Sequence, residues 1–227
     1  MKMNVLLLLF LAAMVVRAAS QPPNPIPVPY DFYSVVLQWP KSVCNTGWRQ
    51  CTKPIPPSFT LHGLWPQRYS FRCFDDCTLY PGNTKFDNNS IPDDDRNVLI
   101  QYWPNMYGDN EAFWRHEYEK HGSCVHPFYL DQLTYFVTAH RVATSTDLYS
   151  ILLAAGIICG GPTTFGAIRT AIHASTGFWP TVRCNRSLAR TLQLFQIYLC
   201  FNKITNAPMD CPKDQKGCID PIDYPQP

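Results

Sequence analysis

The chain has 227 residues, ten cysteines and a formal net charge of +2 at pH 7. Lys2 and Arg17 account for that charge, so the chain after residue 20 holds as many acidic as basic side chains. This balance excludes a protein that binds nucleic acid through a generally basic surface, and the length is that of one domain.

The first 20 residues have the pattern of a secretory signal peptide. Lys2 precedes an unbroken apolar run from Val5 to Val16, and small residues follow up to Ser20. The run is shorter than the roughly 20 residues that span a bilayer, and no later apolar run approaches that length. We therefore expect cleavage near Ser20–Gln21, secretion to the cell exterior and no membrane attachment.

After a Pro-rich tail at 21–29, residues 30–227 are predicted to form one domain of mixed strands and helices. Apolar residues alternate with period two in three segments, which predicts strands at Asp31–Trp39, Phe59–Trp65 and Arg190–Asn202. Helices are predicted at Asp93–Trp103, Asn110–His121, Leu130–Arg141, Thr146–Ala155 and Thr163–Ser175. This combination, with antiparallel-type strands, predicts an α+β fold.

Three positions mark expected helix ends. Asp93–Asp95 is expected to cap the first helix, and Asn110 the second. Gly122 is expected to end the second helix as its C-terminal glycine.

The cysteines all follow residue 20, and an even number in a secreted chain predicts five disulfides. Cys44 and Cys51 are expected to close the loop between the first two strands. The alternative, a zinc site, is weakly supported because no two cysteines are separated by two residues. Two Asn-x-Ser sequons, at Asn88 and Asn185, are candidate glycosylation sites.

His62 lies in the second predicted strand, within Phe59-Thr-Leu-His-Gly-Leu-Trp-Pro66. Strict alternation places Leu61 and Trp65 on one face of this strand and His62 on the other. A lone histidine in a strand is more often structural than catalytic. A strand is nevertheless a rigid element, which suits a group that must be placed accurately.

A second cluster lies in Phe113-Trp-Arg-His-Glu-Tyr-Glu-Lys-His-Gly-Ser-Cys124, on a predicted helix. His116 and Lys120, and likewise Glu117 and His121, are four residues apart, so all four side chains form one patch. The alternative is an ordinary solvated helix face. Three aromatic residues on the same helix and the cysteine that follows it argue against that alternative.

Two histidines on opposite sides of a phosphodiester can act together as general acid and general base near pH 5–7. RNA supplies its own nucleophile, the 2′-hydroxyl, and a nearby lysine and third histidine would stabilise charge on the phosphoryl oxygens. The cluster therefore indicates acid–base chemistry on a phosphate ester, with no metal and no cofactor. From the residues alone, which histidine is acid and which is base stays open.

At these two segments the chain resembles the T-two family of secreted acid ribonucleases. The family motifs are of the type Phe-Thr-Ile-His-Gly-Leu-Trp-Pro and Phe-Trp-x-His-Glu-Tyr-x-Lys-His-Gly-Thr-Cys, and the chain departs from them only at Leu61 and Ser123. The resemblance extends from about Tyr30 to Cys218. It implies an endoribonuclease that acts on single-stranded RNA, on an antiparallel sheet flanked by helices with the site in a cleft across the sheet.

The resemblance also implies roles for the clustered residues. His62 would be the general acid and His121 the general base. His116 would hold the substrate phosphate, while Glu117 and Lys120 would assist with transition-state charge.

The base-binding pockets of the family map to five residues: Gln38, Trp39, Trp103, Asn105 and Met106. The alternative for the two tryptophans is that they are core residues, and both interpretations stay open here.

The disulfides implied by the resemblance are Cys44–Cys51, Cys77–Cys124, Cys184–Cys218 and Cys200–Cys211. Cys73 and Cys159 are left over, and we expect them to pair by elimination.

Within the family, Val35–Cys44 and Pro56–His62 most resemble the self-incompatibility ribonucleases of flowering plants, which act as pistil toxins on pollen-tube RNA. The balanced charge departs from that group, which is usually basic. The alternatives are a general plant ribonuclease for defence or phosphate scavenging, and a catalytically silent storage glycoprotein. We expect a monomer, with variable surface loops as the contact to any protein partner.

Overall fold

The computed structural model describes residues 30–69, 76–79, 84–123, 125, 130–212 and 217–227. The predicted signal peptide at 1–20, the tail at 21–29, Cys73 and Cys124 lie outside the described residues. Within them, no helix has the length and apolar character needed to cross a membrane.

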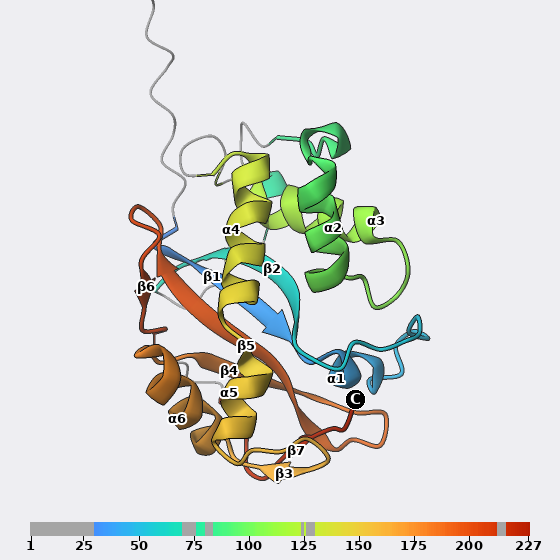
Figure 1. Ribbon diagram of the computed structural model, residues 1–227, viewed down its shortest axis with the longest axis vertical. Helices are drawn as coiled ribbons and strands as arrows, with labels where there is room; N and C mark the ends of the chain where they lie inside the picture. Colours follow the sequence, from blue (N-terminus) through green and yellow to red (C-terminus); the bar gives the residue numbers. More distant parts are fainter. Residues whose placement is uncertain (1–29, 70–75, 80–83, 124, 126–129, 213–216) are drawn as a thin grey trace, which may run out of the picture.

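A sheet built around one long strand forms the centre of the domain (Figure 1). Its strands are β1 (Phe32–Gln38), β2 (Thr60–Gln67), β3 (Gly161–Thr163), β4 (Thr181–Arg186), β5 (Leu192–Asn202), β6 (Pro208–Met209) and β7 (Ile222–Tyr224). The order is β2-β1-β5-β7-β3, with β4 and β6 also paired to β5. All pairs are antiparallel except β5 with β7.

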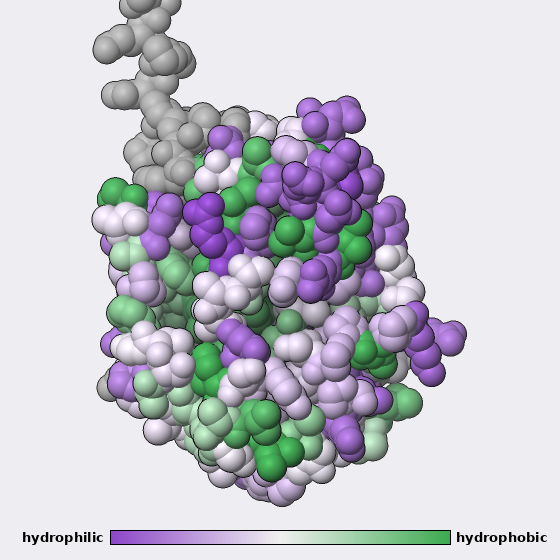
Figure 2. Space-filling model, viewed as in Figure 1, coloured by the Kyte–Doolittle hydropathy of each residue, from purple (hydrophilic) through white to green (hydrophobic). Residues whose placement is uncertain are grey.

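All the helices except α1 lie around this sheet in two groups (Figure 1). The helices are α1 (Pro40–Cys44), α2 (Asp93–Tyr102), α3 (Asn110–Glu117), α4 (Gln132–Ser145), α5 (Leu148–Ala154) and α6 (Phe165–Thr176), with short turns η1 (Cys77–Leu79), η2 (Asn88–Ser90) and the π-helical turn η3 (Tyr118–Gly122). Helices α2, α3 and α4 gather at one end, and α5 and α6 lie with β3 and β7 at the other. Hydrophilic side chains cluster over the end that carries α2 and α3 (Figure 2).

The two faces of β1 have different environments, as its alternating pattern predicts. Tyr33, Val35 and Leu37 belong to the main core, together with Tyr135 and Phe136 of α4. The opposite face carries the polar residue Gln38, which pairs in register with Gln196 of β5. Both glutamines are almost fully buried. One face of the sheet is therefore core, and the other provides polar groups for a site.

A β-bulge at His62 corrects the face prediction for β2. Leu37 pairs with Leu61 and Val36 with Gly63, so His62 is an extra residue without a partner in the register. Alternation is displaced beyond this point, and the ring centroids of His62 and Trp65 lie 4.9 Å apart. The expectation that Trp65 lies on the face opposite His62 is wrong, because a bulge changes the facing of every later residue.

Most predicted strand and helix positions are confirmed, but the caps differ. The carboxylate of Asp109, not the side chain of Asn110, accepts the N-terminal hydrogen bond of α3. Pro92 precedes α2 without a side-chain cap, and Asp93–Asp95 lie inside its first turn, where the helix dipole favours negative charge.

Gly122 is not a left-handed glycine and lies within η3. A Cβ there would lie 2.6 Å from Cδ2 of Tyr118, so close packing is the reason for glycine at this position.

Three predicted disulfides form in the described part of the chain: Cys44–Cys51, Cys184–Cys218 and Cys200–Cys211. Cys77 is also disulfide-bonded, and its predicted partner Cys124 lies outside the described residues. Cys159 is a free thiol, so the predicted Cys73–Cys159 bond is wrong. Pairing by elimination assumed that every cysteine is oxidised, whereas Cys159 is half-buried against the core beside Tyr149.

Candidate active site

The bulge in β2 brings His62 next to the helix that carries the second cluster. Nε2 of His62 lies 3.7 Å from Oε1 of Glu117, and Nε1 of Trp65 donates a 2.8 Å hydrogen bond to Oε2 of the same carboxyl group. Glu117 is 1% exposed, whereas the side chain of His62 is 25% exposed. The two sequence motifs therefore meet at one buried carboxyl group.

Gly63 makes this meeting possible. A Cβ on Gly63 would lie 2.3 Å from both Oε2 of Glu117 and Nε1 of Trp65. These are the two atoms that share the hydrogen bond, so any side chain at position 63 would displace them.

Two residues far away in the sequence hold His62 in place. The indole of Trp103 donates a 2.8 Å hydrogen bond to the carbonyl oxygen of His62. The amide of Gln196, on β5, is hydrogen-bonded to Nδ1 of the imidazole. The hydroxyl of Tyr198 donates to Oε1 of Gln196 at 3.1 Å, so Nε2 of Gln196 is the donor to His62. This leaves the proton of the neutral imidazole on Nε2, which faces Glu117.

His121 approaches from the helical side. Its ring centroid lies 5.0 Å from that of Trp65, and the residue is 7% exposed. Its Nδ1 is buried without a hydrogen-bond partner among the described residues. The hydroxyl of Tyr135 in α4 donates to the carbonyl oxygens of Leu64 and Glu117, at 3.1 and 3.4 Å, and so links α3 to β2. His62 and His121 therefore both contact the indole of Trp65.

Burial and local positive charge set the protonation states. Burial raises the pKa of Glu117 to about 8, against the smaller opposing effects of the Trp65 hydrogen bond and Lys120. Burial, with help from His116 and Lys120, lowers the pKa of His62 to about 4. Burial, Lys120 and the other two histidines lower the pKa of His121 to about 3. The pKa of His116 is lowered by burial and by Lys120. A negatively charged phosphate would raise the pKa of each histidine.

A cavity of about 630 Å³ opens beside His62. Three of the predicted base-binding residues, Gln38, Asn105 and Met106, line it, together with His62, His116, Glu117, Phe113, Trp48, Arg49 and Tyr107. Lys120 and His121 are not part of its lining, so the cavity extends from the His62 side of the site.

Trp39 and Trp103 are fully buried and do not line this cavity. Their indole N–H groups bind the carbonyl oxygens of Pro225 and His62. The structure therefore supports the core interpretation of these two tryptophans, since their rings are used to pack and position the sheet.

Several residues of the site were missed from the sequence. Gln196, Tyr198, Trp48, Arg49 and Tyr107 had no role in the sequence interpretation. A glutamine among the apolar residues of β5 was one available signal, because a buried polar residue needs a specific partner.

Both predicted sequons have engaged amides. Asn88 donates to Oε1 of Glu111 at 2.9 Å, and Asn185 donates to the carbonyl oxygen of Ser42 at 3.0 Å. Glycosylation at either asparagine stays a prediction. Within the described residues, no group of histidine, cysteine, aspartate and glutamate side chains is arranged to hold a metal ion.

Residues 30–211 match the Ribonuclease T2 family. Ribonuclease 1 of Arabidopsis thaliana is 37% identical over 209 residues, which cover 86% of this chain and 86% of the relative. Extracellular ribonuclease LE of Solanum lycopersicum is 32% identical over 204 residues, which cover 86% of this chain and 87% of the relative.

A solved structure shows the same architecture. The crystal structure of the gametophytic self-incompatibility associated SF11-RNase of Nicotiana alata superimposes with a TM-score of 0.73 at 27% identity. The match covers 87% of this chain and 100% of that one, and it confirms the predicted α+β fold.

Proposed function

Because this chain belongs to the Ribonuclease T2 family and is an endoribonuclease, we propose that it cleaves single-stranded RNA by transphosphorylation, with His62 and His121 as the acid–base pair. The single observation that best supports this pair is their shared contact with Trp65. Two imidazoles from different elements lie with their ring centroids 4.9 and 5.0 Å from one indole. Both imidazoles are therefore close enough to one another to act on the same phosphodiester.

In the first step, His121 removes the proton from the 2′-hydroxyl, and the 2′-oxygen attacks phosphorus. The bond between phosphorus and the 5′-oxygen breaks, and His62 donates a proton to that leaving oxygen. The product is a 2′,3′-cyclic phosphate. In the second step water opens the cyclic phosphate, and the two histidines exchange roles. No metal or cofactor takes part in this proposal.

The charge on the phosphoryl oxygens is stabilised by His116, Glu117 and Lys120, which lie on α3 and η3. Glu117, whose pKa is raised to about 8, is protonated below that pH and can donate a hydrogen bond. Lys120 supplies positive charge, and His116 lines the cavity next to His62. Donors placed where charge develops lower the barrier without reorganisation.

Gln196 can serve both protonation states of His62. In the neutral state its amide nitrogen donates to Nδ1. When His62 is protonated on both nitrogens, rotation of the amide presents Oε1 as an acceptor, and the Tyr198 hydroxyl can then accept from the amide nitrogen. The imidazole thus keeps its orientation while it gains and loses a proton.

The test is digestion of single-stranded RNA at pH 5–7, with the cyclic phosphate followed by phosphorus NMR. We expect wild-type activity in EDTA, and loss of activity in His62→Ala and His121→Ala. His173→Ala is the matched control, because His173 stacks on Trp179 and belongs to α6, which lies at the end of the domain opposite α3. Undiminished cleavage by either active-site variant would remove the roles assigned here. An inactive wild type would contradict the proposed acid–base mechanism.

For physiology, we propose that residues 1–20 direct secretion of the protein. The name of the tomato relative, extracellular ribonuclease LE, supports this proposal. The physiological role that we propose is pistil self-incompatibility, which the likeness to SF11-RNase and the resemblance at Val35–Cys44 support. Expression confined to the style would favour that role. Expression in leaves or roots under phosphate limitation would favour a general ribonuclease.

A further inference from the structure

The loop between α1 and β2 holds the most exposed aromatic side chain among the described residues. Trp48 is 70% exposed. A single exposed indole is not by itself evidence of a binding site, because isolated apolar side chains are common on protein surfaces. Trp48, however, lines the cavity that also contains His62, His116 and Glu117.

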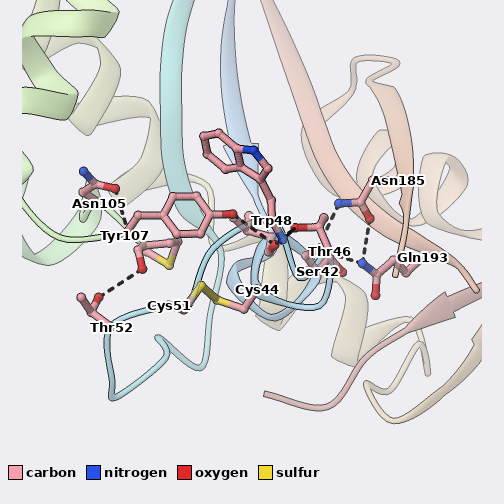
Figure 3. The surroundings of a disulfide bond; sticks show 12 residues. Ser42, Cys44, Thr46, Trp48, Cys51, Thr52, Asn105, Tyr107, Asn185 and Gln193 are labelled. Carbon is pink, nitrogen blue, oxygen red and sulfur yellow. Dashed lines mark hydrogen bonds between the residues drawn. A yellow bond between two sulfur atoms is a disulfide. The ribbon is translucent and has the colours of Figure 1, made fainter. Parts of the chain in front are cut away.

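The loop is held firmly around Trp48 (Figure 3). The Cys44–Cys51 disulfide closes it, and the indole points away from that bond. The backbone N–H of Trp48 donates to Oγ1 of Thr46, which itself donates to the carbonyl oxygen of Val43. The exposed ring is therefore presented by an ordered backbone.

The same loop is bound to the opposite wall of the cavity. The hydroxyl of Thr52 donates to the carbonyl oxygen of Met106 at 3.2 Å, and the hydroxyl of Tyr107 donates to that of Val43 at 3.4 Å (Figure 3). The backbone N–H of Thr52 donates to the same oxygen of Met106 at 2.9 Å. The rings of Tyr107 and Trp48 are edge to face, with centroids 5.5 Å apart. These contacts fix the position of Trp48 relative to the rest of the cavity.

A positive charge accompanies the ring. The guanidinium carbon of Arg49 lies 4.7 Å from the centroid of the Trp48 indole. A guanidinium covers only one face of an indole. An exposed aromatic ring with an adjacent arginine is the combination by which proteins bind single-stranded nucleic acid, through base stacking and phosphate contact.

The direction of the RNA follows from the proposed mechanism, on which this inference rests. His62 protonates the 5′-oxygen of the leaving nucleotide. The cavity lies on the His62 side and excludes His121 from its lining, so it receives the first nucleotide downstream of the cleaved bond. Trp48 and Arg49 are then in position to contact the RNA beyond this first downstream nucleotide.

We propose that Trp48 stacks on the base of the second nucleotide downstream of the cleaved bond, and that Arg49 binds the phosphate between the first and second downstream nucleotides. The enzyme is thereby selective for substrates that continue beyond the cleaved dinucleotide.

The test uses two oligoribonucleotides in which every nucleotide except one carries a 2′-O-methyl group, so that one bond can be cleaved. One has a single nucleotide downstream of that bond, and the other has three. Cleavage is measured by chromatography at substrate concentrations far below KM. We expect wild-type kcat/KM to be about tenfold higher for the longer substrate, because stacking of one base is worth about that factor.

Trp48→Ala should reduce this ratio to below about twofold, and Trp48→Phe should retain part of it. Arg49→Gln should lower the ratio and weaken its dependence on salt. Ile204→Ala, at a residue 74% exposed in another loop, is the control and should keep the wild-type ratio. Unfolding temperatures of all variants are compared, since the exposed Trp48 ring should contribute little to them.

Two results would overturn the proposal: equal wild-type rates on both substrates, or an equal loss on both in Trp48→Ala. The second result would assign Trp48 to loop structure or to the first nucleotide. Failure of the wild type to cleave either substrate would instead contradict the proposed function itself.

Discussion

Trp65 donates its indole N–H to the buried carboxyl group of Glu117 at 2.8 Å, and this bond joins the two sequence motifs of the site. Trp65 also contacts the rings of His62 and His121. A substitution that disturbs the packing of Trp65 against Glu117 is therefore expected to displace both proposed catalytic histidines.

Gly63→Ala should damage the site by sterics alone. The added Cβ would lie 2.3 Å from both atoms of the Trp65–Glu117 hydrogen bond. Overpacking of this kind costs roughly 1–3 kcal/mol in the free energy of unfolding. We expect that loss in urea unfolding, with a decrease in kcat/KM of more than about tenfold. Gly166→Ala in α6 is the control, because its Cβ would meet nothing within 4 Å. A Gly63→Ala enzyme with wild-type activity would contradict the close packing described here.

Glu117→Gln should change how stability depends on pH. The folded-state pKa of Glu117 is raised to about 8 from an ordinary value of 4.5, so the folded protein keeps a proton that the unfolded chain releases. The free energy of unfolding therefore falls as pH rises between these values, by up to about 1.4 kcal/mol per pH unit. The histidines, with lowered pKa values, act in the opposite direction, and only below about pH 6.5.

Urea unfolding between pH 6.5 and 8 isolates the contribution of Glu117. Wild-type stability should fall across this window, and that of Glu117→Gln should stay nearly constant. Parallel curves for the two proteins would show that Glu117 is ionised in the folded state at pH 6.5.

Lys120→Gln should shift the pH dependence of activity. Lys120 lowers the pKa of both His62 and His121, so its removal raises both values. The proposed acid, His62, then stays protonated to higher pH, and the alkaline limb of kcat/KM moves upward. Lys85→Gln is the matched control, because Lys85 is 78% exposed and pairs with Glu119 at 4.0 Å. A lower rate with an unmoved pH profile would confine Lys120 to transition-state binding.

Gln196→Leu should lower kcat about tenfold or more, with a smaller effect on KM, because His62 loses the hydrogen bond that orients its ring. Nitrogen NMR of the imidazole should show a change in the tautomer of His62. Gln193→Leu is the control on the same strand: its amide binds the carbonyl oxygen of Ser42 and the side chain of Asn185, away from His62. That variant should lose stability and keep its kcat. An unaltered tautomer in Gln196→Leu would leave Gln196 with a packing role only.

Local patterns in the sequence were sufficient for the main elements and for the reacting groups. Alternation located β1 and β5, helical spacing located α2 to α6, and the motifs around His62 and His121 identified the family. The short strand β4 was missed, because its six residues, Thr181–Arg186, include two arginines, a cysteine and an asparagine and form a strand only by pairing with β5.

The sequence by itself determined the residues available for chemistry and the elements that carry them, because these follow from side-chain type and from periodicity along the chain. Tertiary structure alone decided the facing of Trp65, the partner of His62 on β5, the burial of Trp39 and Trp103, the free thiol of Cys159 and the place of Trp48 at the cavity. Each of these depends on contact between segments distant in the sequence. The bulge at His62 changes the facing of later residues, and burial changes the pKa of Glu117, so neither is encoded in local spacing.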